Sequence, residues 1–231
     1  MFYVISYARK GQGPLENTIL LRFFRGMPFT LKISGLELRA AVAIFAHVND
    51  IKPSIVKDRK LLNIELKRLT AKEYRETPGS GIALVLDNIR SAHNTGSAFR
   101  SADAFKADKV VLCGLTPSPP SPMIHKTALG AEDSVPFESY GSTAEAVLRL
   151  RSEGYTIVSV EQTVSSVKMD RFVPEQGRKY ALVFGNEVDG VGEDVVELSD
   201  LCLEIPQEGT KHSLNVSVCI GVVLWHFRLV R

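Results

Sequence analysis

The chain has 231 residues, of which 45% are hydrophobic and 23% charged, and its formal net charge is +2. This composition is typical of a water-soluble globular protein with one sizeable core, and it excludes a low-complexity chain. Apolar runs such as Ala40–Ala46 are far shorter than the roughly 20 residues that a membrane span needs, so no span is predicted.

The three cysteines, Cys113, Cys202 and Cys219, are scattered through apolar sequence and lack CxxC spacing. Their odd number and their surroundings are typical of buried thiols in a reducing compartment. The N-terminal residues also lack the ordered zones of a secretory signal. We therefore expect a cytoplasmic protein without a membrane anchor and without a metal site.

The small net charge conceals an asymmetry along the chain. Residues 1–80 contain 14 Lys or Arg and 7 Asp or Glu, whereas residues 81–231 contain 14 and 19. A basic N-terminal part on a mildly acidic body favours contact of that part with a polyanion. An ordinary solvated surface helix explains the charge equally well.

Residues 1–57 form an N-terminal extension of uncertain structure, with a strand expected within Phe2–Tyr7 and a helix over Leu36–Val48. Residues 58–80 are predicted to be a basic helical arm and linker. Asp58 is a candidate N-cap, and leucines recur at helical spacing from Leu62 onward. The basic residues of this arm that we expect to contact a polyanion are Arg59, Lys60, Lys67 and Arg68.

From residue 81 to residue 231 short apolar runs alternate with helix-like segments. The runs are continuously apolar, which is typical of strands buried on both faces of a parallel sheet. We therefore predict an α/β domain over 81–231. The expected strands are Ile82–Leu86, Lys109–Cys113, Val135–Phe137, Thr156–Val160, Tyr180–Phe184 and Leu201–Ile205, and the expected helices are Asn94–Phe105, Thr143–Arg151 and one from Ser213 or Asn215 to Trp225.

Unusual polar residues follow three of these strands. After the first, Asn94, Gly96 and Arg100 have the spacing N-x-G-x-x-x-R at the start of a helix. Helix capping by Asn94 and a surface role for Arg100 are the plain structural explanations. The carboxyl ends of parallel strands are also where open α/β sheets bind ligands, so a functional role is open at the same positions.

The second and third strand ends add further polar groups. Gly185 and Glu187 follow the strand that ends at Phe184, while Ser213 and Asn215 follow the strand that ends at Ile205. Capping of the last helix again accounts for Ser213 and Asn215 without any ligand. Together, the three ends predict a cleft that combines an amide, a guanidinium, a carboxylate and a hydroxyl.

In order and spacing, these three motifs resemble those of the SpoU/TrmH family, the RNA ribose 2′-O-methyltransferases of the SPOUT superfamily. The motifs are Asn94-x-Gly-x-x-x-Arg100, Leu182-Val183-Phe184-Gly185-Asn186-Glu187, and Ile205-Pro206 leading to Ser213-Leu214-Asn215-Val216-Ser217. The resemblance covers roughly residues 81–231. It implies an α/β fold whose C-terminal segment forms a trefoil knot, a homodimer, and S-adenosylmethionine bound in the knot.

The resemblance also implies roles for single residues. Cofactor contacts fall on Gly185, Ile205 and Leu214, with a further contact near Gln162. The catalytic and substrate positions are Asn94, Arg100, Glu187, Ser213 and Asn215. The implied substrate is structured RNA, and the compact chain favours tRNA over rRNA.

Other classes of protein remain open at this stage. A non-catalytic RNA-binding protein that keeps the SPOUT fold is the main alternative. A Rossmann-type enzyme is disfavoured because the first strand is followed by neither G-x-G-x-x-G nor a P-loop, and a hydrolase because there is no G-x-S-x-G turn.

Overall fold

The computed structural model describes residues 4–7, 18–22, 28–32 and 59–229. The chain divides into two compact units, Met1–Leu66 and Lys67–Arg231. The boundaries predicted at residues 57 and 80 stay predictions. Among the described residues, no helix is long and apolar enough to cross a membrane.

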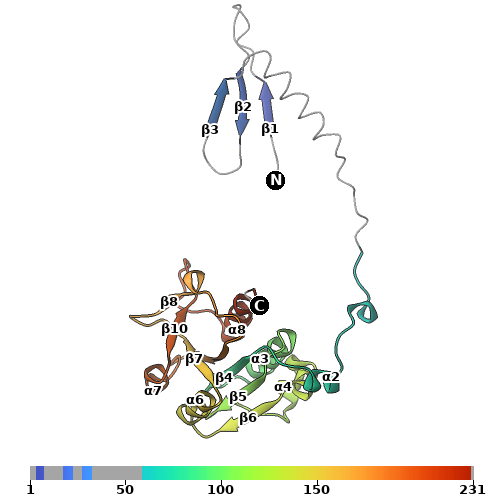
Figure 1. Cartoon of the computed structure of the whole chain (residues 1–231), viewed down its shortest axis with the longest axis vertical. Coiled ribbons are helices and arrows are strands. Elements are labelled where there is room, and N and C mark those ends of the chain that lie inside the picture. Colours follow the sequence, from blue (N-terminus) through green and yellow to red (C-terminus); the bar gives the residue numbers. More distant parts are fainter. Residues whose placement is uncertain (1–3, 8–17, 23–27, 33–58, 230–231) are drawn as a thin grey trace, which may run out of the picture. The chain divides into compact units, whose positions relative to one another are not determined.

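In the first unit three strands form an antiparallel sheet in the order β1-β2-β3 (Figure 1). The strands are β1 (Val4–Tyr7), β2 (Thr18–Arg22) and β3 (Pro28–Lys32). The strand expected within Phe2–Tyr7 is therefore confirmed. The helix expected over Leu36–Val48 lies outside the described residues.

The continuous helix expected from Asp58 is wrong. A single 3₁₀ turn, η1 (Asn63–Leu66), is followed by residues 67–70, which have no regular secondary structure, and α2 (Ala71–Glu76) begins separately. Thr70 starts α2 because its hydroxyl accepts a hydrogen bond from Glu73 N while the Glu73 carboxylate accepts one from Thr70 N, which is a capping box. Leu62 is 64% exposed, so the leucine repeat does not mark a buried helical face.

Seven strands of the second unit form one sheet in the order β6-β5-β4-β9-β7-β10-β8, and every pair is parallel. This confirms the predicted parallel α/β architecture. The strands are β4 (Ile82–Asp87), β5 (Lys109–Cys113), β6 (Phe137–Tyr140), β7 (Tyr155–Val160), β8 (Val167–Lys168), β9 (Lys179–Phe184) and β10 (Leu201–Glu204).

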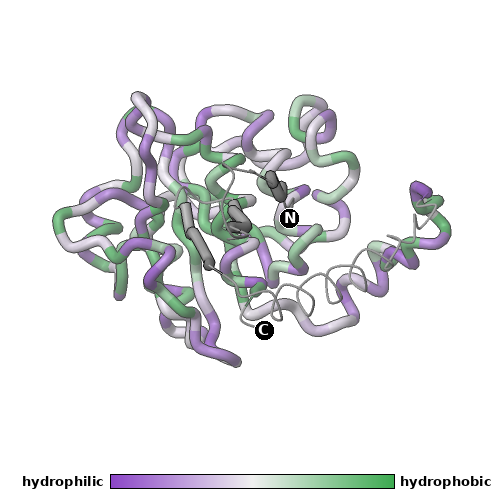
Figure 2. The backbone as a smooth tube through the Cα atoms, turned by 90° about the horizontal axis from the view of Figure 1, so that it is seen from above, coloured by the Kyte–Doolittle hydropathy of each residue, from purple (hydrophilic) through white to green (hydrophobic). Residues whose placement is uncertain are grey.

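Helices cover both faces of this sheet, because alternate residues of the central strands enter two separate cores. Ile82, Leu84 and Leu86 pack with one set of helices, while Ala83 and Val85 pack with the other. Figure 2 shows the hydrophobic segments gathered in the interior of the unit and the hydrophilic ones in its outer loops. The first face carries α3 (Ala92–Ala104), α4 (Pro122–Ala128), α5 (Ala131–Ser134) and α8 (Val216–Arg228), and the second carries α6 (Thr143–Ser152) and α7 (Glu193–Glu197).

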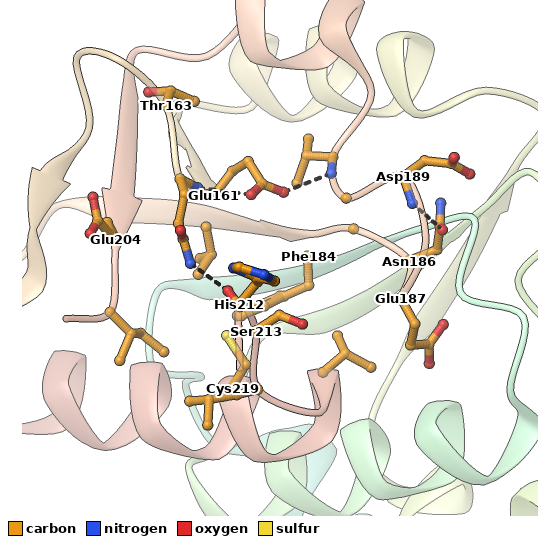
Figure 3. A pocket seen from close by; sticks show the side chains of 18 of the residues that line it. Glu161, Thr163, Phe184, Asn186, Glu187, Asp189, Glu204, His212, Ser213 and Cys219 are labelled. Carbon is orange, nitrogen blue, oxygen red and sulfur yellow. Dashed lines mark hydrogen bonds between the residues drawn. The ribbon is translucent and has the colours of Figure 1, made fainter. Parts of the chain in front are cut away.

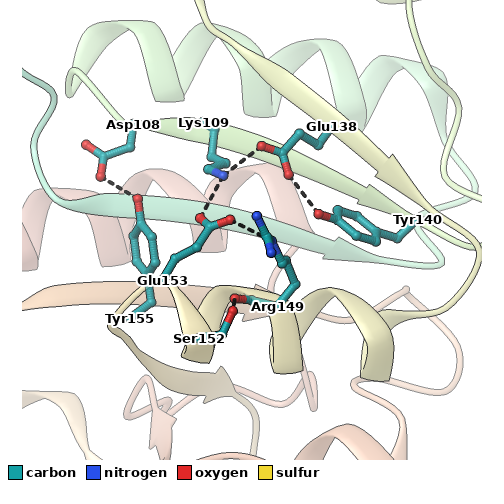
Figure 4. Close-up of polar contacts among 8 residues, drawn as sticks. All are labelled: Asp108, Lys109, Glu138, Tyr140, Arg149, Ser152, Glu153 and Tyr155. Carbon is teal, nitrogen blue, oxygen red and sulfur yellow. Dashed lines mark hydrogen bonds and ion pairs between the residues drawn. The ribbon is translucent and has the colours of Figure 1, made fainter.

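An ionic network ties α6 to the edge of the sheet (Figure 4). Lys109 Nζ donates to Glu138 Oε1 at 2.7 Å and to Glu153 Oε2 at 3.0 Å. Glu153 also accepts from Arg149 Nε at 3.0 Å. Because the Lys109 side chain is only 16% exposed, this pairing compensates for the desolvation of its ammonium group.

Close packing of α3 against α4 depends on Gly96. A β-carbon at Gly96 would overlap the Thr127 hydroxyl and the carbonyl oxygen of Ile124. The glycine of the N-x-G-x-x-x-R motif is therefore a packing residue that lets the two helices approach each other.

Candidate active site

A cavity of about 940 Å³ lies at the carboxyl ends of β7, β9 and β10. Its walls are the segments that follow these three strands, together with the first turn of α8 (Figure 3). Parallel strands bring these segments together, because their carboxyl ends all meet at one edge of the sheet. Two of the three strand ends predicted to form the site, those of β9 and β10, line this cavity, whereas no residue that directly follows β4 is part of its described lining.

The loop after β9 forms one wall, and its path depends on two glycines. A β-carbon at Gly185 would overlap backbone atoms of Gly190 and Val191. Gly190 itself has φ +70°, which glycine adopts without strain. Asn186, which is 9% exposed, fastens the turn because its Oδ1 accepts from the backbone N of Val188 and of Asp189, each at 2.9 Å.

Two residues at the end of β7 join the walls of the cavity. The Glu161 carboxylate accepts from Val191 N at 3.0 Å, and so holds the loop after β9. Gln162 Nε2 donates to the carbonyl oxygen of His212 at 2.9 Å, and so holds the loop before α8. Sequence reasoning missed Glu161, although its place directly after a buried strand was a signal.

A chain of side-chain hydrogen bonds spans the rim of the cavity. Asn94 Nδ2 donates to Glu187 Oε1, and Asn215 Nδ2 donates to Asn94 Oδ1 at 3.4 Å. Asn215 is also the N-cap of α8, since its Oδ1 accepts from Ser217 N at 2.9 Å. Asn215 therefore both caps its helix and faces the other two motifs.

The residue that caps the N-terminal end of α3 is not part of these hydrogen bonds across the rim. Ser91, not Asn94, is its N-cap, because the Ser91 hydroxyl accepts from Asn94 N at 3.3 Å. The capping explanation for Asn94 is therefore wrong, and its amide is available for contacts across the rim.

Arg100 lies apart from that cluster. It is exposed on α3, one turn beyond Gly96, and Gly96 contacts α4. Asn94 is two residues before Gly96, which places it about 200° away around the helix. Asn94 and Arg100 are six residues apart, which places them about 120° apart around the helix, and Arg100 does not line the cavity.

The residues predicted to hold a cofactor lie together. Gly185, Ile205 and Leu214 all line the cavity, as do Gln162 and Ser213. Ser213 comes from the loop before α8 and is exposed where it lines the cavity (Figure 3). The cofactor residues, Ser213, Asn215 and Glu187 thus surround one hollow.

The four basic residues expected to contact RNA are all exposed. The Arg59 guanidinium forms a bidentate pair with Glu65, at 2.8 and 2.6 Å, which lowers the pKa of the Glu65 carboxyl to about 2. Lys67, just before α2, has φ +46°, which is in the left-handed region. Arg68 lies near the Asp103 carboxyl and partly offsets the rise in the pKa of Asp103 that burial causes.

These features define a class of protein, the open parallel α/β proteins that bind a small ligand beyond the carboxyl ends of their strands. Residues 81–225 match the model of the SpoU rRNA Methylase family. The chain therefore belongs to this family.

Curated relatives agree with that assignment. The chain is 35% identical over 148 residues to the 23S rRNA (guanosine-2′-O-)-methyltransferase RlmB of Nitrosomonas europaea, covering 62% of this chain and 54% of the relative. It is 30% identical over 165 residues to RlmB of Coxiella burnetii, covering 71% and 63%. The chain thus spans less than two thirds of the length of these relatives.

Solved structures show the same fold. The A. aeolicus TrmH/SpoU tRNA modifying enzyme superposes with a TM-score of 0.62 at 25% identity, covering 74% of this chain and 85% of the other. The AdoMet-bound rRNA methyltransferase from Sinorhizobium meliloti superposes with a TM-score of 0.61 at 25% identity, covering 68% and 59%. The predicted knotted α/β fold of the SPOUT type is confirmed by these neighbours.

Proposed function

We propose that this protein is an S-adenosylmethionine-dependent methyltransferase that methylates a ribose 2′-hydroxyl in ribosomal RNA. The observation that carries the proposal is the juxtaposition of the cavity with the hydrogen-bonded chain Glu187–Asn94–Asn215 at its rim. Family membership over residues 81–225 supports the same activity.

The cavity suits the proposed cofactor in size and chemistry. A volume of about 940 Å³ is in the upper part of the range that small-molecule sites occupy. Gly185 and Gly190 keep side chains out of the wall, which leaves backbone groups within reach of a ligand. Gly185, Ile205 and Leu214 would hold the cofactor, which supplies a methyl group activated by a positively charged sulfur.

The residues at the rim would prepare the acceptor hydroxyl. A ribose 2′-hydroxyl is a weak nucleophile, so its reaction needs removal of the proton or stabilisation of the developing alkoxide. Asn94 is oriented from both sides, by the Glu187 carboxylate and by the Asn215 amide, and would position the ribose. Ser213 would shape the nucleotide pocket beside it.

Arg100 would act as an electrostatic stabiliser that also grips a neighbouring phosphate, because a guanidinium stays protonated and binds oxyanions in a planar fork. It lies about 120° around α3 from Asn94 and does not line the cavity. We propose that a second protomer, or an RNA strand that lies along α3, brings Arg100 together with the rim cluster.

We propose a homodimer as the active unit, because α8 and the residues that flank it on both sides expose an apolar stripe. Leu214, Val218, Val222, Trp225 and Leu229 are between 37% and 64% exposed and recur at intervals of three or four residues. A contiguous apolar stripe of this kind on an otherwise packed helix is typical of a protein interface.

The named relatives favour rRNA as the substrate, in place of the tRNA expected from the compact chain. RlmB of Nitrosomonas europaea is described as a 23S rRNA enzyme, and residues 1–80 carry the positive charge suited to a polyanion. Arg59, Lys60, Lys67 and Arg68 are proposed to contact phosphates. The tRNA modifying enzyme of A. aeolicus makes tRNA the second candidate.

The test is methyl transfer from radiolabelled S-adenosylmethionine to rRNA and, separately, to tRNA, followed by nucleoside analysis. We expect a labelled 2′-O-methylnucleoside from rRNA that is lost with Asn94→Ala and Arg100→Ala. Arg149→Ala, which removes an arginine from α6 on the other face of the sheet, is the matched control and should retain activity. Label in tRNA alone would refute the rRNA assignment, and RNA binding without cofactor binding would favour the non-catalytic alternative.

A further inference from the structure

Glu161 holds a carboxylate at the wall of the cavity in a fixed position. Its Oε2 accepts from Val191 N at 3.0 Å and its Oε1 accepts from Gln162 N at 2.8 Å. Gly190 approaches so closely that a β-carbon there would overlap Oε2. Two backbone donors and a tight neighbour thus fix where this charge lies, unlike the charge of a mobile surface glutamate.

Among the described residues that line the cavity, none is a Lys or Arg that could offset this charge, and His212 is the one histidine among them. The ion pair of Arg90 with Asp189, at 3.4 Å, joins two exposed side chains at the outer edge. The other carboxylates of the lining only add negative charge, and they belong to Glu187, Asp189, Glu193, Glu197 and Glu204.

The charge of Glu161 acts across the hollow. Cys219 lies on α8, on the opposite side of the cavity in Figure 3. Burial, with the negative charge of Glu161 as a further cause, raises the pKa of the Cys219 thiol to about 12. A ligand between these two walls therefore lies in the field of the Glu161 carboxylate.

We propose that Glu161 is a specificity-determining residue by which the cavity distinguishes a cationic methyl donor from its neutral product. This inference rests on the proposed function. S-adenosylmethionine carries a positive sulfonium, whereas S-adenosylhomocysteine has an uncharged thioether after the methyl group has left. A fixed negative charge favours the first ligand and not the second, so it promotes release of the spent product.

Binding calorimetry on the full chain, without RNA, tests the proposal. The three ligands are S-adenosylmethionine, S-adenosylhomocysteine, and sinefungin, in which an amine replaces the methylated sulfur and carries the positive charge. With Glu161→Gln we expect the two cationic ligands to lose about three- to tenfold more affinity than S-adenosylhomocysteine, the size expected for one charge acting over several ångströms. Added salt should weaken the cationic ligands more than the neutral one in the wild type.

Two further variants separate charge from structure. Glu161→Asp keeps the charge, so it should keep the ratio of the cationic to the neutral affinities even if all three fall. Glu197→Gln removes a charge from α7 at the rim and should change that ratio by less than about twofold. If Glu161→Gln loses the same factor of affinity for all three ligands, Glu161 is a purely structural residue and the inference is overturned. The proposed function would survive that result, because the wild type still binds the cofactor. A wild type that binds none of the three overturns both.

Discussion

Replacing Gly185 by alanine tests whether the wall of the cavity is as tight as the backbone indicates. Gly185 has no positive φ, so its backbone accepts alanine, and the effect of the methyl group is purely steric. That methyl group would overlap backbone atoms of Gly190 and Val191, which must retreat by more than about 1 Å to reach ordinary contact distances of about 3.5 Å. The retreat also stretches the 3.0 Å hydrogen bond from Val191 N to Glu161.

The size of the effect follows from these two losses. Overpacking costs about 1–3 kcal/mol, and a stretched hydrogen bond adds about 1 kcal/mol. The loop lies at the surface of the unit, so it moves rather than unfolding the core, and most of the cost falls on ligand binding. We expect the affinity for S-adenosylmethionine to drop about ten- to a hundredfold, because 1.4 kcal/mol is about a factor of ten.

Calorimetric titration of the variant with cofactor measures this loss, and circular dichroism checks that the fold is kept. Gly141→Ala is the matched control, since a β-carbon at Gly141 meets nothing within 4 Å. Wild-type affinity in Gly185→Ala would show that the ligand does not depend on this wall, and would refute the placement of the cofactor in the cavity.

Two further predictions concern the helices. Gly96→Ala should lower the free energy of unfolding by about 1–3 kcal/mol, since the added β-carbon overlaps Thr127. Gly221→Ala on α8 should raise the free energy of unfolding by about 0.5–1 kcal/mol through helix propensity, because its β-carbon meets nothing within 4 Å. Urea denaturation measures both changes, and equal effects of the two substitutions would contradict the packing argument. If Arg100 acts on the site of the partner protomer, Arg100→Ala and Asn215→Ala should each be inactive alone. An equal mixture of the two variants should recover about one quarter of wild-type methyl transfer, because half of the dimers are then mixed and hold one intact site of two. No recovery would show that both residues serve the site of the same protomer.

The central strands could be predicted from the sequence because their side chains are buried on both faces, which leaves a continuous apolar signal. Ile82–Leu86 lies wholly within β4, and Lys109–Cys113 coincides with β5. Short helices carried no such signal. The stretch before α4 reads as a proline-rich loop, although Pro122 at the first position of a helix is well suited to start one.

The site could be predicted in outline for a related reason. Polar residues that follow buried strands must meet at one edge of a parallel sheet, so Glu187 and Asn215 were expected to lie together. The flank of α3 that carries Arg100 depends on how Gly96 packs against α4. The hydrogen bond of Glu161 to Val191 joins residues 30 positions apart. Neither contact leaves a local pattern in the sequence.

The division of charge in the chain constrains how an RNA substrate meets the cofactor under the proposed function. The described lining of the cavity includes six carboxylates and neither Lys nor Arg, so it repels phosphates. The excess of positive charge in the sequence lies in residues 1–80. Phosphates must therefore be held away from the hollow while a single ribose reaches its rim. The side chains at that rim, Asn94 and Asn215, are uncharged amides, which can contact a sugar hydroxyl without attracting the backbone of the RNA into the cofactor site.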